Sequence, residues 1–324
     1  MRQFGPLSAL ILWAALCVCG SSYGFWLGYG GRAFAATFTA FAYFLAVMLL
    51  LAARGTSDSV RSNYGFSGGL VLSIATYLAY LVYAFGTNTL SLARIGAIAG
   101  LVFFPPMLAA SAKDKPAGAR QDWLLLSGLW VFVKFSPSHW LWPYPNGHLA
   151  YIFTVLLALN IALVSFVLVR QIGGIGYFIG WGHRWSYYVL ASFAAFACIA
   201  IPLGVGIHFI RFAPHWTDWK SLPFVAIAIF FFIAWPEEFL FRGLLQNLLS
   251  RLSKSPWIGW LTASVLFGFS HITNGGFPNW RYVILASVAG VFYGWTWRKS
   301  NSIFASALVH ATVNTTWRFF FRTL

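Results

Sequence analysis

Apolar runs, each about the length that crosses a bilayer, follow one another along almost the whole sequence. A helix needs about 20 mostly apolar residues to span the hydrocarbon core. Only 8% of the residues are charged and 60% are hydrophobic, whereas soluble domains carry about 25% charged residues. Because lipid cannot satisfy an open backbone, and the alternation typical of barrel strands is missing, we predict an all-α fold.

The apolar runs predict a polytopic membrane helical bundle of ten or eleven transmembrane helices. The predicted spans are residues 6–25, 34–53, 66–86, 95–111, 123–136, 149–169, 186–210, 221–250, 256–273, 280–297 and 302–320. The run at 123–136 is short and contains Lys134, so a half-span or an interfacial helix is an alternative there. A Gly-rich stretch at 171–184 separates an N-terminal accessory transmembrane region (1–185) from a second region (186–324).

The net charge of +15 would suggest nucleic-acid binding in a soluble protein. Here the basic residues, such as Arg54, Lys113 and Arg170, stand at the edges of apolar runs. That pattern is typical of loop charges that orient spans and meet anionic lipid. No basic stripe interleaved with aromatic residues is present, so we expect no nucleic-acid partner. We expect a multi-pass protein of a bacterial cytoplasmic membrane, with the lipid bilayer as its surroundings.

The only two glutamates of the chain, Glu237 and Glu238, are adjacent inside the apolar segment FFIAWPEEFLFRGLL. An ionisable residue within a span costs about 2.5–3.5 kcal/mol on insertion scales, so such residues usually serve a function. A buried ion pair that only holds helices together is the alternative. The remaining acidic residues are predicted to lie in loops. They are Asp58, Asp114, Asp122 and Asp218.

Helical geometry separates the two glutamates. Residues four apart share a helix face, so Arg242 is predicted to pair with Glu238. The side chain of Glu237 then points about 100° away and is available as a general base. Pro236 removes a backbone donor just before the pair, and we expect a kink there that gives water access.

Two histidines are predicted inside late spans. His271 follows Phe267 by one turn, and His310 precedes Asn314 by one turn on the same face. A single histidine in a helix is usually a hydrogen-bonded packing residue. Polar sites on three neighbouring spans would each be costly, however, unless they meet in a polar cavity.

Three motifs in this order resemble those of a known family. EEFLFR (237–242) matches the pattern EExxxR, FGFSH (267–271) matches FxxxH, and HATVN (310–314) matches HxxxN. The set resembles the CAAX prenyl protease and bacteriocin-processing family, also called CPBP or Abi, of membrane endopeptidases. The resemblance covers roughly residues 186–324, and no motif could be placed in the first 185 residues.

The resemblance implies a glutamate-dependent intramembrane endopeptidase. Residue by residue, it implies that Glu237 activates water with the assistance of His271. It also implies that Glu238 and Arg242 support the site as an ion pair. The substrate would be a membrane-anchored peptide or protein, cut in a membrane-associated or C-terminal hydrophobic segment.

The same resemblance implies that His310 and Asn314 stabilise the oxyanion. We expect no cofactor. A zinc site is an alternative, because one Glu and two His could bind zinc with water in the fourth position. No HExxH helix is present, and Arg242 near the site disfavours a cation, so we expect metal-free catalysis.

Two other functions remain open from the sequence. Intramembrane carboxylates also relay protons or bind ions in transporters. A non-catalytic membrane scaffold or immunity protein could keep the same fold.

Overall fold

The computed structural model describes residues 2–145, 148–214 and 216–324, without the side chains of residues 148 and 216–218. The chain forms two compact units. One comprises residues 3–173, and the other comprises Arg2 together with residues 174–324. The boundary between the two units, after residue 173, lies inside the Gly-rich stretch. It comes before the predicted boundary at residue 185. The accessory and peptidase roles assigned to the two regions remain predictions.

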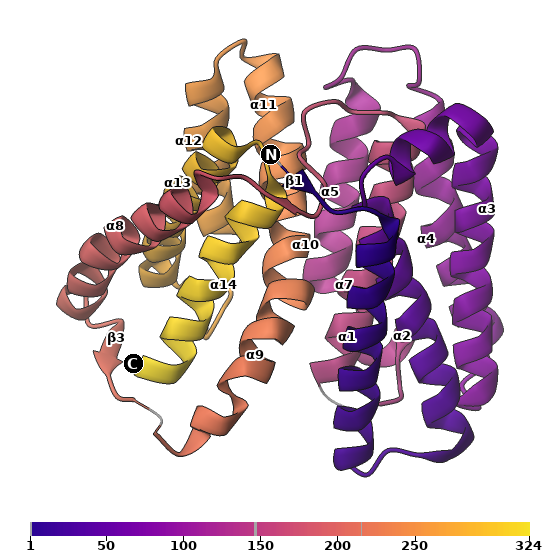
Figure 1. Ribbon diagram of the computed structural model, residues 1–324, viewed down its shortest axis with the longest axis horizontal. Helices are drawn as coiled ribbons and strands as arrows, with labels where there is room; N and C mark the ends of the chain where they lie inside the picture. Colours follow the sequence, from indigo (N-terminus) through magenta and orange to yellow (C-terminus); the bar gives the residue numbers. More distant parts are fainter. Residues whose placement is uncertain (1, 146–147, 215) are drawn as a thin grey trace. The chain divides into compact units, whose positions relative to one another are not determined.

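The unit of residues 3–173 is built around one long helix in which α7 continues directly into a π-helical segment, η1. This helix, Leu149–Val169, is almost entirely buried, and helices α2, α3, α4 and α5 pack against it. The helices of the unit are α1 (Pro6–Trp26), α2 (Gly31–Leu51), α3 (Thr56–Gly86), α4 (Leu92–Ala110), α5 (Arg120–Phe135), α6 (Ser138–Leu141), α7 (His148–Ala162) and η1 (Leu163–Val169) (Figure 1).

This unit contains a buried ion pair between Asp122 and Arg170. The settings predicted for these two residues were both wrong. Asp122, predicted to lie in a loop, is in the first turn of α5 and is fully buried. Its carboxylate accepts hydrogen bonds from Nε and Nη2 of Arg170, at 2.6 and 2.8 Å. Arg170, predicted to be a loop charge at the lipid surface, is also buried and donates to the carbonyls of Lys113, Lys115 and Pro116. The opposite charge of Asp122 is what makes burial of this arginine tolerable.

The second unit consists of five long helical stretches and short strands. Its longest helix, Trp219–Leu252, is a succession of α, π and 3-10 segments. The elements are α8 (Trp185–Gly206), β3 (Ile210–Phe212), η2 (Trp216–Ser221), α9 (Leu222–Ile229), η3 (Phe230–Ala234), α10 (Trp235–Glu238), η4 (Phe239–Gln246), α11 (Asn247–Leu252), α12 (Pro256–Phe269), α13 (Trp280–Ser300), α14 (Ile303–Phe320) and β4 (Phe321–Thr323). The strands β1 (Arg2–Gln3) and β2 (Gly180–Trp181) have two residues each.

Close packing of α12 against α13 depends on a glycine. A Cβ atom at Gly294 would stand 2.5 Å from Cδ1 of Trp260 on α12, closer than side chains can approach. The absence of a side chain at residue 294 therefore lets the two helices lie side by side (Figure 1).

Both ends of α14 are held by neighbouring segments of the same unit. At its start, the backbone N–H of Ile303 donates to the carbonyl of Gly176 in the Gly-rich stretch, at 3.0 Å. At its end, β4 pairs antiparallel with β3, the strand that follows α8, with Phe212 opposite Phe321. These two attachments fix the axial position of α14.

The structure confirms an all-α polytopic helical bundle. Helices lie in all eleven predicted runs, and seven helices among the described residues are long and apolar enough to cross a membrane. The predicted number of ten or eleven spans is thus larger than the number that meets this criterion. Helix α5 has 16 residues and α12 has 14, which are short for a span. Helices α13 and α14 have the length but not the apolar composition.

Candidate active site

The site begins with a stripe of buried polar residues on the helix 219–252. Glu238, Arg242 and Gln246 follow each other at intervals of four residues, and all three are fully buried. In a regular α-helix, residues at this interval drift around the axis, because a turn takes 3.6 residues. The wider π-helical turn of η4 (Phe239–Gln246) opposes that drift. The stripe therefore stays turned toward the neighbouring helices α13 and α14.

Glu238 and Arg242 form the ion pair that their spacing predicts. Nε of Arg242 lies 3.1 Å from Oε2 of Glu238, and both side chains are 0% exposed. The guanidinium also lies over the ring of Phe267, 4.9 Å from its centroid, and 5.8 Å from that of Tyr293. Within the part of the chain that the structure describes, its nitrogens make no hydrogen bond of good geometry. Arg242 is thus held by charge and by aromatic faces.

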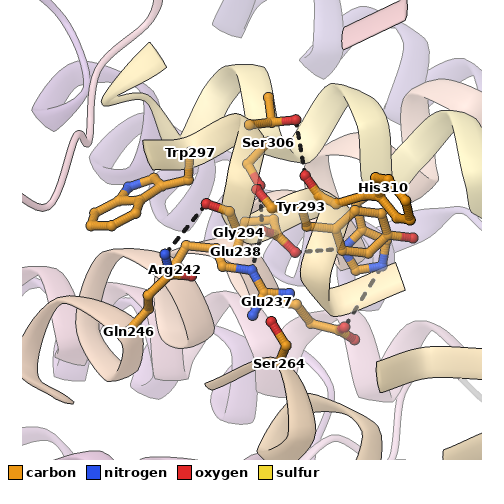
Figure 2. Close-up of polar contacts among 12 residues, drawn as sticks. Glu237, Glu238, Arg242, Gln246, Ser264, Tyr293, Gly294, Trp297, Ser306 and His310 are labelled. Carbon is orange, nitrogen blue, oxygen red and sulfur yellow. Dashed lines mark hydrogen bonds and ion pairs between the residues drawn. The ribbon is translucent and has the colours of Figure 1, made fainter. Parts of the chain in front are cut away.

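Helix α14 brings two further partners to Glu238 (Figure 2). The hydroxyl of Ser306 donates to Oε2 at 2.5 Å, and Nδ1 of His310 lies 3.0 Å from Oε1. An ionised carboxylate only accepts hydrogen bonds, so Nδ1 of His310 carries a hydrogen when Glu238 is charged. Both oxygens of Glu238 are therefore occupied inside the protein.

The other ring nitrogen of His310 faces Glu237. Nε2 lies 3.8 Å from Oε2 of Glu237, beyond hydrogen-bond distance but within ionic contact. The side chain of Glu237 is 27% exposed, whereas that of Glu238 is 0% exposed. His310 thus stands between a buried glutamate and an accessible one, as Figure 2 shows.

Aromatic rings fix the imidazole of His310 in place. The ring of Tyr293, on α13, stacks on it with centroids 4.5 Å apart and planes 16° apart. The ring of Phe267, on α12, meets it edge-on at 5.7 Å. Because Phe267 also lies under the guanidinium of Arg242, one aromatic residue packs against both the ion pair and the imidazole.

His271 lies at the edge of this cluster and differs from its predicted setting. Helix α12 ends at Phe269, so His271 is in the turn after the helix and not inside a span. Its Nδ1 lies 2.9 Å from the carbonyl of Phe267 and 3.1 Å from Oγ of Ser270. Because a carbonyl can only accept, a hydrogen bond to Phe267 requires a hydrogen on Nδ1. Its ring packs against those of Phe267 and Tyr282, with centroids 4.9 and 5.0 Å apart.

Asn314 lies one turn beyond His310 on the same face of α14, as its spacing predicts. The side chain is partly exposed, and its amide makes no hydrogen bond to the described residues. The amide is therefore available to a bound molecule.

Two residues of the site were not recognised in the sequence, namely Ser306 and Tyr293. The interval Ser306–His310–Asn314 places Ser306 on the site face of α14, and this spacing was the signal available for it. The stacking of Tyr293 on His310 joins α13 to α14, and no pattern in the local sequence predicts it.

Among the described residues, no group of three or more His, Cys, Asp or Glu side chains is arranged so that it could hold a metal ion.

A family model described as type II CAAX prenyl endopeptidase Rce1-like matches residues 219–316. This segment belongs to the CAAX protease family. It contains Glu237, Glu238, Arg242, His271, His310 and Asn314. Comparisons with curated proteins and with solved structures give no match.

The family that residues 219–316 match is one of protease hydrolases, and the seven apolar helices make the chain a multi-pass membrane protein. The matched segment lies entirely within the unit of residues 174–324. The unit of residues 3–173 lies outside the match.

Proposed function

We propose that this protein is an intramembrane endopeptidase in which Glu237 activates the attacking water. The proposal rests on the contrast between the two glutamates. Glu238 has both oxygens occupied by Ser306, His310 and Arg242. Glu237 is partly exposed, and its one ion-pair contact among the described residues is with the far nitrogen of His310. Glu237 is therefore the carboxylate that can accept a proton from water.

Charge balance supports the imidazolium form of His310 in the resting site. The negative charge of Glu238 is opposed by Arg242, and that of Glu237 would be opposed by a protonated His310. In a site of low dielectric, a neutral cluster costs much less than one with a net charge. A protonated His310 would donate Nδ1–H to Glu238 and present Nε2–H on the side of Glu237.

The proposed reaction follows from these positions. Glu237 takes a proton from water as the water oxygen bonds to the scissile carbonyl carbon. The carbonyl oxygen becomes an oxyanion, which accepts hydrogen bonds from Nε2–H of His310 and from the amide of Asn314; one such donor is worth about 3–4 kcal/mol. The C–N bond then breaks, and Glu237 returns the proton to the leaving amine. His271 would orient the water through Nε2.

The substrate is proposed to be a membrane-associated peptide. The matched family model is named for prenyl CAAX endopeptidases, so a prenylated peptide with a C-terminal CAAX sequence is the first candidate. A lipid anchor would keep such a peptide at the bilayer, next to a site carried on apolar helices.

A cleavage assay tests this proposal. The full chain is placed in liposomes with a prenylated CAAX peptide and with an unprenylated control, and products are identified by mass spectrometry. We expect internal cleavage of the prenylated peptide by wild type and by Ser264→Ala. Among the described residues, the Ser264 hydroxyl hydrogen-bonds only to the Trp260 carbonyl of its own helix. We expect no cleavage by Glu237→Ala. Cleavage by Glu237→Ala at the wild-type rate would refute the proposal, as would a wild-type protein that cleaves no membrane-associated peptide.

A further inference from the structure

The hydroxyl of the buried residue Ser306 lies between two hydrogen-bond acceptors. Its hydroxyl lies 2.5 Å from Oε2 of Glu238 and 2.9 Å from the backbone carbonyl of Tyr293, and the side chain is fully buried. A hydroxyl has one hydrogen to donate, and both neighbours accept. An ionised carboxylate is the stronger acceptor, so the hydrogen points to Glu238.

We infer that Ser306 is a positioning residue, which acts through Glu238 to set the orientation and the proton affinity of His310. The catalytic part of this inference rests on the proposed function. Ser306 itself is too deeply buried to touch a substrate. Its effect passes from Oε2 of Glu238 to Oε1 of the same carboxylate, and from there to Nδ1 of His310.

The groups around Glu238 and His310 define what Ser306 can change. The helix that carries Glu238 contributes Arg242 and Glu237, and α13 contributes Tyr293, which stacks on the imidazole of His310. Helix α12 contributes the uncharged ring of Phe267 to His310. Helix α14 contributes Ser306, whose neutral hydroxyl donates a hydrogen bond to Glu238.

The loss of the Ser306 hydroxyl should shift the titration of His310 in one direction. A donor to a carboxylate disperses part of its negative charge. Without that donor, more negative charge faces Nδ1 of His310, and the imidazolium becomes harder to deprotonate. We expect Ser306→Ala to raise the pH at which His310 titrates by roughly one unit, the scale set by a hydrogen bond to a charged group.

The loss of the Ser306 hydroxyl should also lower the rate of cleavage. With one of three partners lost, the Glu238 carboxylate can rotate and His310 is held less well. We expect kcat of Ser306→Ala to fall about tenfold, the scale of one hydrogen bond, with KM unchanged. The alkaline limb of the pH–activity profile should move to higher pH together with the titration of His310.

The experiment uses the full chain with ¹⁵N-labelled histidine in detergent micelles. NMR follows the titration of His310, whose signal is assigned by its loss in His310→Gln. The variants are Ser306→Ala, Ser306→Cys and Ser264→Ala. Ser264 is the matched control, because it is also a buried serine of this unit but donates, within the described ranges, only to the carbonyl of Trp260. Thermal unfolding of each variant shows that it is folded.

The expected result is an upward shift of the His310 titration in Ser306→Ala, a smaller shift in Ser306→Cys, whose thiol is a weak donor, and none in Ser264→Ala. A titration of Ser306→Ala that equals wild type would overturn the inference, as would an equal shift in Ser264→Ala. The NMR result does not depend on catalysis. If wild type cleaves nothing, the proposed function fails while the inference about His310 is still decided.

Discussion

Nδ1 of His310 lies 3.0 Å from Oε1 of Glu238, and this contact joins α14 to the helix that carries both glutamates. The two adjacent glutamates have different surroundings. Glu238 is enclosed and orients the imidazole, while Glu237 keeps an accessible carboxylate on the other side of the same ring. Orientation of a histidine by a buried carboxylate is a recurrent way of fixing which ring nitrogen carries the proton.

The Glu238–Arg242 pair should be needed for stability as well as activity. Glu238→Ala leaves the fully buried Arg242 without its counter-charge, and we expect a loss of about 3–5 kcal/mol in the free energy of unfolding. The double variant Glu238→Leu with Arg242→Met removes both charges, and it should recover much of that stability without recovering cleavage. Thermal unfolding and the cleavage assay measure the two effects. A double variant less stable than Glu238→Ala would contradict this account of the pair.

Asn314 should affect the rate and not the stability. Its amide makes no hydrogen bond to the described residues, so Asn314→Ala should unfold at the wild-type temperature. As an oxyanion donor, its loss should reduce kcat about 10²–10³-fold with little change in KM. Thr312→Ala is the control on the same helix, because that exposed hydroxyl donates to the carbonyl of Leu308 and to no other described residue. Equal rates for the two variants would refute the assigned role.

The sequence predicted well the features that lie within one helix. The spacing of Glu238 and Arg242 indicated their contact, and the run of apolar residues indicated the helices. It predicted less well where a helix ends. His271 seemed to lie inside a span, because FGFSHIT is apolar on both sides, but α12 ends at Phe269.

The sequence did not predict the contacts between helices, for a different reason. The stacking of Tyr293 on His310 and the bond from Ser306 to Glu238 depend on the axial position of α13 and α14. That position follows from packing, including the close approach at Gly294. Likewise, Asp122 and Arg170 are 48 residues apart, and neither residue signals the other in the sequence.

The Asp122–Arg170 pair should stabilise the unit of residues 3–173 without taking part in the reaction. Asp122→Ala leaves a buried arginine unpaired, and we expect about 3–5 kcal/mol of lost stability. The kcat of the fraction that remains folded should equal that of wild type. Asp114→Ala is the control, because Asp114 is exposed in the same region. A change in kcat per folded molecule would show that this unit influences the site.

Chelation tests the metal-free mechanism. The proposed reaction uses Glu237, His310 and Asn314 without a Lewis acid, so prolonged treatment with EDTA should leave the cleavage rate unchanged. Added zinc should then have no activating effect. Loss of cleavage on chelation, with recovery on adding zinc, would favour the zinc alternative and require new roles for Glu237 and His310.

Replacing Glu237 by glutamine tests the central claim most directly. Glu237→Gln preserves the size of the side chain but cannot accept a proton from water. We predict that this variant melts as wild type does and binds the prenylated peptide with wild-type affinity. Its single-turnover cleavage rate should fall about 10²–10⁴-fold, the contribution of a general base. A folded Glu237→Gln variant that cleaves the bound peptide at the wild-type rate would contradict the account.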